Sequence, residues 1–524
     1  MAFHILDYVV FGLVLLISLG IGIFFSFRQK STNEYFMGGR QLKLLPVTIS
    51  ITATITSAHS LLGTPAEIYA QGTQYFMHVF GVFLGTLLGG FLFVPLFHPL
   101  GLTSVFEYLE SRFRSRATRL VLNVIMIICH SVVSSAGIYG PSVAMHTMTG
   151  LPTWLIILLF GVTTTIYTAI GGMKGVILAD VFQAIFIYAG VIAVCVLGLI
   201  KVGGFGAALD LHRNWDRLNF FIVDPDPTVH PSFWSSVIGY AFLAFCLSHI
   251  QASMQRYCGL PSLATAKRSM YLSAGLLFCS HFLFSLSGFA AFAYFASISC
   301  DPLRAKIIRS PNQILPYFVM KIMTVPGLPG LFVACMASTA LSTSSSLLNG
   351  YAAVIWEDYM SHRFKRWSER SKTTAAKVIA FLLGIIGILL AFLLTNVKGT
   401  LVQFVIGIAG ALVGPVTGIY VLGAINPRAN SKAAAIGLAA SLSLTLLLSI
   451  GSIALKTNQF LAPSPVSGCE ARNMRNFTMS ENITENVSLG ALHASNNETM
   501  QMFNDKMEEE PGQLGANQTK RFCH

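Results

Sequence analysis

Residues 338–349 read S-T-A-L-S-T-S-S-S-L-L-N, and eight of these twelve side chains are hydroxyls or amides without charge. The chain on either side is apolar enough to sit in a lipid bilayer. Polar side chains within a membrane helix are costly, so they usually mark a pathway for an ion or a substrate. Hard cations such as sodium prefer oxygen ligands. The stretch therefore indicates a membrane helix that lines an ion path.

The composition points to the same class of protein. Of the 524 residues, 54% are hydrophobic and 11% are charged, whereas a soluble domain carries about 25% charged residues. Crossing the hydrocarbon core takes about 20 apolar residues. Segments of this kind lie at 7–27, 45–69, 76–97, 120–147, 152–170, 176–200, 233–255, 269–298, 328–358, 376–395, 401–422 and 433–455. We expect an all-α polytopic membrane protein with about twelve transmembrane helices.

The basic residues predict the orientation, because Lys and Arg near helix ends are retained on the cytoplasmic side. Alternate loops carry them: Arg28, Lys30, Arg40 and Lys43; Arg112, Arg114, Arg116 and Arg119; Arg256, Lys267 and Arg268; Arg363, Lys365, Arg366, Arg370 and Lys372; Arg428 and Lys432. We expect these loops in the cytoplasm and the N-terminus outside. The net charge of +12 then reflects topology, and no nucleic-acid partner is expected.

An even number of spans places the tail, residues 456–524, outside the cell. It carries five N-x-S/T sequons, which are glycosylated only in an exposed lumenal segment, at Asn476, Asn482, Asn486, Asn497 and Asn517. Its low-complexity composition predicts disorder. The alternative is that one or two of the sequons arise by chance. Cys300, Cys469 and Cys523 are also expected outside, where they could pair.

The second predicted span is rich in hydroxyls and contains a helix breaker, Pro65. Proline lacks a backbone donor and displaces the carbonyl four residues earlier, which belongs to Leu61. An interrupted helix is tolerated in a membrane where its freed carbonyls line a cavity, and transporter sites are built from such helices. We therefore expect a broken helix at an ion site, with a simple proline kink as the alternative. His59 and Glu67 flank the expected break and are candidates for the substrate pathway.

Two further polar groups lie in the predicted spans. Asp180 and Gln183 are three residues apart on one helical face, and a carboxylate inside the membrane is costly unless it is paired or functional. The alternative is that Asp180 lies close enough to the cytoplasmic end to stay hydrated. The same alternative holds for His249 and Gln251 in the seventh span.

These motifs resemble the sodium:solute symporter family over roughly residues 5–455. The resemblance rests on S-T-N-E-Y-F-M-G-G-R (31–40), S-A-H-S-L-L-G-T-P-A-E-I-Y (57–69), L-T-S-V-F-E-Y-L-E-S-R-F (102–113), Y-T-A-I-G-G-M-K-G-V-I-L-A-D-V-F-Q (167–183), Q-R-Y (255–257) and L-P-G-L-F-V-A-C…L-S-T-S-S-S-L-L-N (328–349). D-P-D-P (224–227), P-G-L-P-G-L-F (326–332) and E-D-Y (357–359) are similar to the branch of multivitamin, monocarboxylate and iodide symporters.

The resemblance implies a leucine-transporter-like fold with an inverted repeat of five plus five helices. In the transmembrane domain, residues 1–455, a first helix (7–27) precedes repeat one (about 45–200) and repeat two (about 233–422), and a further helix (433–455) follows. The implied sodium site takes side-chain oxygens from Ser342 and Thr343 and backbone carbonyls near Thr339, Ser57 and Ser60. Asp180 and Gln183 match positions that assist sodium exit, and Gln251 matches a polar position of this branch.

The chain also departs from the family pattern. Ser60 stands where the iodide transporter has glutamine, which argues against iodide as the main substrate, and Thr339 occupies a glycine position. A thirteenth span, common in this branch, is not found; either that helix is absent or the sequence is incomplete at its end.

The expected function is sodium-coupled symport of a small organic anion, a monocarboxylate or a carboxylate-bearing vitamin, into the cell across the plasma membrane by alternating access. Sodium is the only expected metal, no other cofactor is implied, and the partners are sodium, the substrate and the bilayer. A substrate-gated sensor or sodium leak with the same fold, or a symporter of iodide or another anion, is the alternative. No enzyme signature such as paired carboxylates is found.

Overall fold

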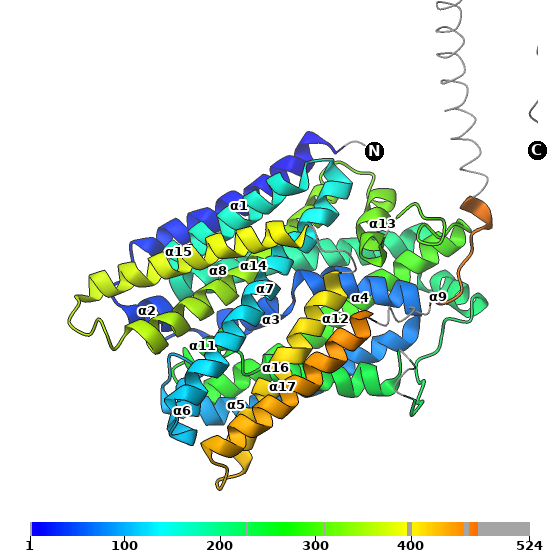
Figure 1. The fold of residues 1–524 in the computed structure, drawn as a ribbon. Helices are drawn as coiled ribbons and strands as arrows, with labels where there is room; N and C mark the ends of the chain where they lie inside the picture. Colours follow the sequence, from blue (N-terminus) through cyan, green and yellow to red (C-terminus); the bar gives the residue numbers. More distant parts are fainter. Residues whose placement is uncertain are drawn as a thin grey trace, which may run out of the picture. The chain divides into compact units, whose positions relative to one another are not determined.

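The computed structural model describes residues 3–226, 229, 231–308, 310–395, 401–454 and 461–469, and all regular structure in these ranges is helical (Figure 1). The chain divides into two compact units, Met1–Ser464 and Pro465–His524. The elements of the first unit are α1 (Ile5–Ser26), α2 (Thr32–Met37), η1 (Gly38–Arg40), α3 (Leu44–Ile55), α4 (Ala58–Gln71), η2 (Thr73–Met77), α5 (His78–Phe97), η3 (His98–Leu100), α6 (Glu107–Phe113), α7 (Arg116–Thr149), α8 (Thr153–Val202), α9 (Phe205–Asn214), η4 (Trp234–Gly239), α10 (Tyr240–Leu247), α11 (Gln251–Cys258), α12 (Leu263–Ser297), η5 (Pro311–Gln313), α13 (Ile314–Ile322), α14 (Leu328–Ile355), η6 (Trp356–Met360), α15 (Glu369–Leu394), α16 (Leu401–Ile425) and α17 (Ser431–Ala454).

The described residues contain nine helices that are long and apolar enough to cross a membrane, or eleven when two bent helix pairs each count as one span. The difference from about twelve arises at α8, a single assigned helix of 50 residues. At 1.5 Å per residue, α8 is about 75 Å long, enough for two crossings of a core of about 30 Å. The two predicted spans, 152–170 and 176–200, meet inside α8 at Gly172.

Gly172 allows the chain to turn between these two spans. Its φ of 56° and ψ of −165° lie outside the helical region, in a conformation that L side chains rarely adopt. A Cβ at this position would lie 2.7 Å from Cδ2 and 2.9 Å from the carbonyl oxygen of Tyr35. The sharp bend and the close packing against α2 therefore both require glycine.

Two spans are broken in the middle. α3 and α4 are bent by 56° at Thr56 and Ser57, whereas the pair Trp234–Leu247 and Gln251–Cys258 is bent by 61°. The prediction of a broken second span is confirmed, but its assignment to Pro65 was wrong. Pro65 lies inside α4, and the break occurs earlier because Thr56 (ψ 75°) and Ser57 (ψ 165°) leave the helical conformation.

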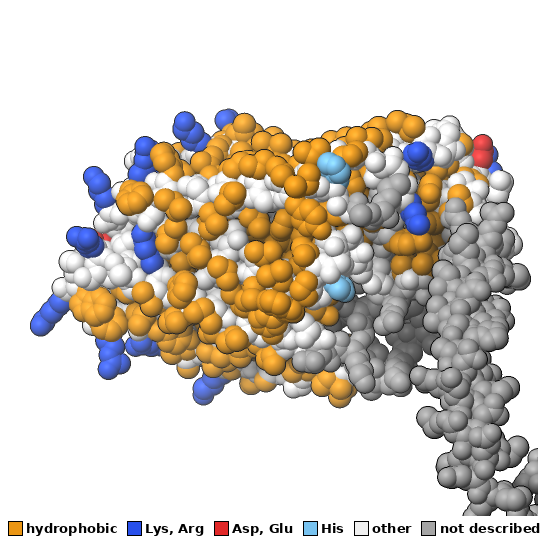
Figure 2. Space-filling view, turned by 90° about the horizontal axis from the view of Figure 1, so that it is seen from above, with side chains coloured by type: hydrophobic (Ala, Val, Ile, Leu, Met, Phe, Trp, Pro, Cys, Tyr) orange, Lys and Arg blue, Asp and Glu red, His pale blue; other side chains and the backbone are white. Residues whose placement is uncertain are grey.

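The helix α14 forms the core of the first unit. It packs against α8, α1, α7, α15 and α3, and nearly all of its residues are buried. The close approach to α8 depends on Gly190, where a Cβ would lie 2.6 Å from Cβ of Cys335. The polar stretch of α14 therefore faces other helices and not lipid. By contrast, hydrophobic side chains cover much of the outer surface, and Lys and Arg gather toward one end (Figure 2).

Candidate functional site

The polar stretch of α14 is buried along its whole length. Each of its hydroxyl and amide side chains is at most 6% exposed: Ser338, Thr339, Ser342, Thr343, Ser344, Ser345, Ser346 and Asn349. The partners of these groups lie on α3, α7 and α8 as well as on α14 itself. A row of oxygens thus runs through the centre of the helix bundle.

The predicted sodium ligands of α14 face different neighbours. The Thr343 hydroxyl donates to the carbonyl of Thr54, with Oγ1 and O 3.1 Å apart, in the last turn of α3 before the break. Ser342 Oγ instead donates to Oδ1 of Asp180 at 2.7 Å, and Thr339 Oγ1 donates to the carbonyl of Met336 at 2.8 Å. The structure therefore brings Thr343 to the broken span and turns Ser342 away toward α8.

The broken span offers a different carbonyl from those expected. Ser57 caps the start of α4, and its carbonyl accepts the backbone N–H groups of Ser60 and Leu61, at 3.0 and 3.1 Å. The Thr54 carbonyl is the one that meets the hydroxyl of Thr343. Sequence reasoning did not single out the Thr54 carbonyl, because nothing in the chain marks which carbonyl of a broken helix turns toward its neighbour.

Asp180 lies at the centre of a buried polar network. Its carboxylate accepts hydrogen bonds from Ser342 at 2.7 Å and from Ser50 of α3, and it pairs with the Arg256 guanidinium, Nη2 to Oδ2, at 3.0 Å. Both charged side chains are fully buried. The alternative that Asp180 stays hydrated near the cytoplasmic end was therefore wrong.

Arg256 joins both broken spans to the core. It lies on α11 and donates to the hydroxyls of Ser50 on α3, through Nε at 2.7 Å, and Ser346 on α14. Sequence reasoning counted Arg256 among the residues of a cytoplasmic loop and missed its partner. The available signal was the buried carboxylate itself, because a charge inside a membrane protein needs a counter-charge.

Gln183 and Gln251 lie away from this network. Gln183 Nε2 donates to the hydroxyl of Ser18 on α1 at 3.2 Å. Gln251 is bound at both ends of its amide by the backbone of the loop before α6: Oε1 accepts from the N–H of Val105 at 2.8 Å, and Nε2 donates to the Thr103 carbonyl at 2.7 Å. Gln251 therefore fixes that loop to the start of α11.

Three side chains of the broken spans retain free hydrogen-bonding capacity. His59 is the second residue of α4 after the break, whereas Glu67 is its tenth and so does not flank the break as expected. Nε2 of His59 and Oε2 of Glu67 are buried without a hydrogen-bond partner among the described residues. His249 lies in the break between α10 and α11, is 1% exposed, and has no partner on either ring nitrogen within the described part of the chain. Sequence reasoning had allowed His249 to be solvated at a helix end, and the break buries it instead.

Arg217 anchors the far end of the broken helix α4. Its guanidinium donates to the carbonyls of Ile68 and Tyr69 in the last turn of α4, and to the Pro463 carbonyl at 2.9 Å. Arg217 is 3% exposed, and its Cζ lies 3.9 Å from the ring centroid of Phe292. Cation–π contact and three carbonyls together replace the hydration of the buried charge.

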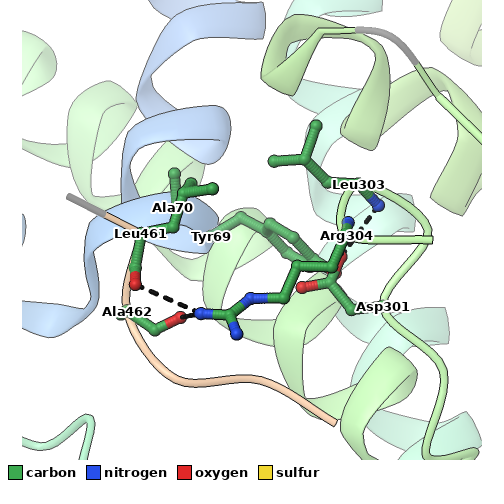
Figure 3. A pocket seen from close by; sticks show the side chains of 7 residues that line it. All are labelled: Tyr69, Ala70, Asp301, Leu303, Arg304, Leu461 and Ala462. Atoms are coloured by element: carbon green, nitrogen blue, oxygen red, sulfur yellow. Dashed lines mark hydrogen bonds between the residues drawn. The ribbon is translucent and has the colours of Figure 1, made fainter. Parts of the chain in front are cut away.

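The segment Leu461–Ser464, here called the strap, completes this anchor. The Ala462 N–H donates to the Ala70 carbonyl at 2.7 Å, and Arg304 holds the carbonyls of Leu461 and Ala462 at 3.3 and 3.0 Å (Figure 3). The pocket between them is also lined by Tyr69, Asp301 and Leu303. The strap therefore binds the end of α4 by its backbone.

Several expectations concern the end of the chain. The five sequons, at Asn476, Asn482, Asn486, Asn497 and Asn517, lie outside the described residues. Cys300 and Cys469 are disulfide-bonded. Cys523 also lies outside the described residues.

Broken helices around a polar central helix are typical of one class of protein, the membrane transporters. A solved structure of a Na+-coupled sialic acid symporter, substrate-bound, outward-open and with a novel Na+ site, matches with a TM-score of 0.75 at 26% identity, covering 86% of this chain and 93% of that one. A structure of Mhp1, a nucleobase-cation-symport-1 family transporter, matches in fold alone, with a TM-score of 0.52 at 12% identity, covering 80% and 95%.

The sequence comparisons identify the family. The model of the sodium:solute symporter family matches residues 35–440, so the chain belongs to this family. It is 36% identical to the sodium-coupled monocarboxylate transporter 1 of Xenopus laevis, over 89% of this chain and 74% of that one. It is also 36% identical to the sodium-dependent multivitamin transporter of Oryctolagus cuniculus (92% and 75%) and 35% identical to the human sodium/iodide cotransporter (85% and 70%).

Proposed function

We propose that this chain uses the sodium gradient to import a small organic anion across the plasma membrane by alternating access. The observation that supports the proposal best is the contact between Thr343 of the polar helix and the Thr54 carbonyl at the break of α3 and α4. Family membership makes sodium the coupling ion. Inward movement of one charge supplies about 2.3 kcal/mol per 100 mV of membrane potential.

The sodium ion would bind between α14 and the break of α3 and α4. Thr343 Oγ1 and the Thr54 carbonyl are the first ligands, because the two oxygens already face each other at 3.1 Å. Ser342, Thr339, Ser57 and Ser60 remain candidates for the rest of the shell. Neutral hydroxyl and carbonyl ligands suit a site that must release its ion in each cycle.

The Asp180 network would act as the cytoplasmic gate and the sodium exit. It fixes α3 and α11, the cytoplasmic halves of the two broken spans in the predicted orientation, to α8 and α14. When Ser342 exchanges Asp180 for another partner, one hydrogen bond of this network is lost. A sodium ion that binds Ser342 would break its hydrogen bond to Asp180 and so weaken the gate. Ion release would thus be coupled to the opening of the gate. Gln183, one turn further along α8, would line the same exit.

The substrate would carry a carboxylate. The names of two relatives specify monocarboxylates and vitamins, whereas that of a third specifies iodide. At the breaks, the N-terminus of α4 presents a partial positive charge, and His249 can donate one hydrogen bond from a neutral ring. Both favour a small anion without requiring a fixed cation. His59 and Glu67 would line the route of the substrate. Gln251 would support this route indirectly, because both ends of its amide are bound to the loop before α6.

Uptake into cells that express this chain tests the proposal and identifies the substrate. Labelled lactate, nicotinate, biotin, pantothenate and iodide are supplied with sodium or with choline outside. We expect one organic anion to accumulate only with sodium, and a His249→Phe variant to raise the KM for this anion more than that for sodium. A sodium-dependent current without accumulation would instead identify a sensor or leak, and iodide accumulation would contradict the substrate class.

A further inference from the structure

Two segments far apart in the sequence form one basic surface. One is the end of α1 with the residues after it, 24–30, and the other is the loop and first turn of α15, residues 362–370. Lys377 Nζ of α15 donates to the Ser26 carbonyl at 3.5 Å. The helix α15 also packs against α2, the helix that follows α1 in the chain. These contacts place the two segments side by side; we call their surface the basic patch.

The basic patch carries cations without acidic partners. Its exposed basic side chains are Arg28, Lys30, Arg363, Lys365, Arg366 and Arg370, and none forms an ion pair in the part of the chain that the structure describes. The nearby acids are already used, since Glu34 pairs with Lys174 at 2.8 Å and Glu369 pairs with Lys372 at 2.9 Å. Figure 2 shows Lys and Arg gathered toward one end of the molecule. The patch thus has a net positive charge that the protein does not neutralise.

Several other arginines of the predicted cytoplasmic loops serve the fold. Arg40 donates to the carbonyls of Gly101 and Leu102, and Arg112 donates to three carbonyls around the turn between α16 and α17. Arg119 pairs with Asp358 and Glu110. Arginines with and without partners contribute equally to membrane topology, so topology does not require the side chains of the basic patch to stay unpartnered. The unpartnered side chains of the basic patch therefore remain available to a ligand.

Exposed aromatic side chains accompany the basic patch. Phe24 and Phe27 are 50% and 85% exposed, and Trp367 is 44% exposed. The Arg28 guanidinium lies 4.3 Å above the Phe24 ring, and Trp367 packs against Phe364 with ring centroids 4.2 Å apart. Aromatic rings of this kind concentrate at the level of lipid headgroups. Cations beside them lie where they can reach lipid phosphates.

We propose that the basic patch binds the phosphorylated headgroup of an anionic membrane lipid. Clusters of Lys and Arg directly beside a transmembrane helix attract anionic lipids, and arginine binds phosphate through paired N–H donors. The headgroup lies between Arg28 and the loop residues Arg363 and Arg366, and the aromatic rings contact the adjoining acyl chains. The lipid thereby links the end of α1 to the start of α15. The predicted cytoplasmic orientation assigns this site to the inner leaflet.

Lipid binding to the purified full chain in neutral detergent tests the proposal. The probes are dioctanoyl phosphatidylinositol 4,5-bisphosphate, dioctanoyl phosphatidylcholine, soluble inositol trisphosphate and an oligo-glutamate peptide, and binding is measured by native mass spectrometry and by titration. The patch variant is R363Q/K365Q/R366Q/R370Q. The matched control, R114Q/R116Q/K267Q/R268Q, removes the same charge from exposed or partly exposed positions of other loops. Unfolding temperatures verify that both variants fold, and the milder R363Q/R366Q variant replaces the patch variant if it does not.

We expect the anionic lipid to bind at least tenfold more tightly than phosphatidylcholine. The patch variant loses at least tenfold in affinity, and the control variant binds like the native chain. Equal loss in both variants, or no preference for the anionic lipid, would overturn the proposal. Binding of inositol trisphosphate as tight as that of the lipid would reassign the patch to a soluble phosphate. Binding of an acidic peptide in preference to the lipid would reassign it to a protein partner.

Discussion

Adjacent hydroxyls of α14 contact different neighbours, and the proposed ion site and gate use different ones. Thr343 meets the Thr54 carbonyl at the break, whereas its neighbour Ser342 donates to Asp180. The two adjacent side chains diverge because consecutive residues of a helix point about 100° apart. An ion bound at Thr343 would therefore lie on a different face of α14 from the contact between Ser342 and Asp180, although the two residues are adjacent in sequence.

Replacing Thr343 by Val should weaken sodium binding without altering the shape of the helix. The exchange removes one ligand oxygen, worth about 1–3 kcal/mol, and so raises the sodium concentration for half-maximal uptake by about 5- to 150-fold. Sodium titration of uptake measures this shift. Thr417→Val is the matched control, because the buried Thr417 hydroxyl donates to the Val413 carbonyl of its own helix and lies outside the proposed ion site. An unchanged sodium dependence in the Thr343 variant would exclude this site.

Breaking the Asp180–Arg256 pair should cost more than removing both charges. Asp180→Asn or Arg256→Gln leaves one buried charge without its partner, at a cost of about 3–5 kcal/mol. The double variant leaves two neutral groups, so its loss of stability should be smaller than the sum of the two single losses. Unfolding temperatures of the four purified proteins measure the coupling. Additive losses would show that the two side chains do not stabilise each other.

Among the elements, the strongest patterns in the sequence gave the most reliable predictions. Long apolar segments predicted the spans, and the hydroxyl-rich stretch predicted the polar core helix α14, because burial in lipid restricts composition more than any local propensity does. The break in the second span was predicted but misplaced, since Pro65 fits inside α4 and the actual break uses Thr56 and Ser57. Arg256 could not be matched to Asp180, because only the tertiary fold brings together residues 76 positions apart.

The kink in α8 offers a test of how its two halves are joined. Gly172→Ala adds a Cβ 2.7 Å from a Tyr35 side-chain atom at a residue with φ of 56°. We expect a loss of about 1–3 kcal/mol in stability and a lower unfolding temperature. Gly414→Ala in α16 is the control, since its Cβ would have no neighbour within 4 Å. Equal unfolding temperatures in the two variants would show that the kink tolerates a side chain.

The outer anchor of α4 should limit access to the end of that helix. Arg217→Gln removes the charge that holds the carbonyls of Ile68, Tyr69 and Pro463. With Ala70→Cys as a reporter, a membrane-impermeant thiol reagent applied outside should react several-fold faster in the Arg217 variant. Arg213→Gln provides the control, because Arg213 is exposed and pairs only with the exposed Asp210. Equal rates in the two variants would mean that Arg217 does not restrain α4.

Over the whole molecule, two sets of contacts hold the broken spans, one at the halves α3 and α11 and the other at the far end of α4 alone. Arg256 ties the halves α3 and α11 to the core through Asp180, Ser50 and Ser346, and Arg217 with the strap holds the far end of α4. Alternating access requires that these two sets of contacts are not released together, because simultaneous release would open a leak. The buried polar centre is then accessible from only one side of the membrane at a time.

Flux into sealed proteoliposomes that contain only the purified chain is a direct test of sodium-coupled symport, because no other transporter is present. The labelled anion that the uptake experiment in cells identifies is present at equal concentration inside and outside the vesicles. An inward sodium gradient is then imposed. We predict that the anion rises inside above its outside concentration, that an inward potassium gradient produces no such rise, and that the Thr343→Val protein needs more sodium for the same rate. Equilibration without accumulation, or sodium entry that is independent of the anion, would contradict coupled transport.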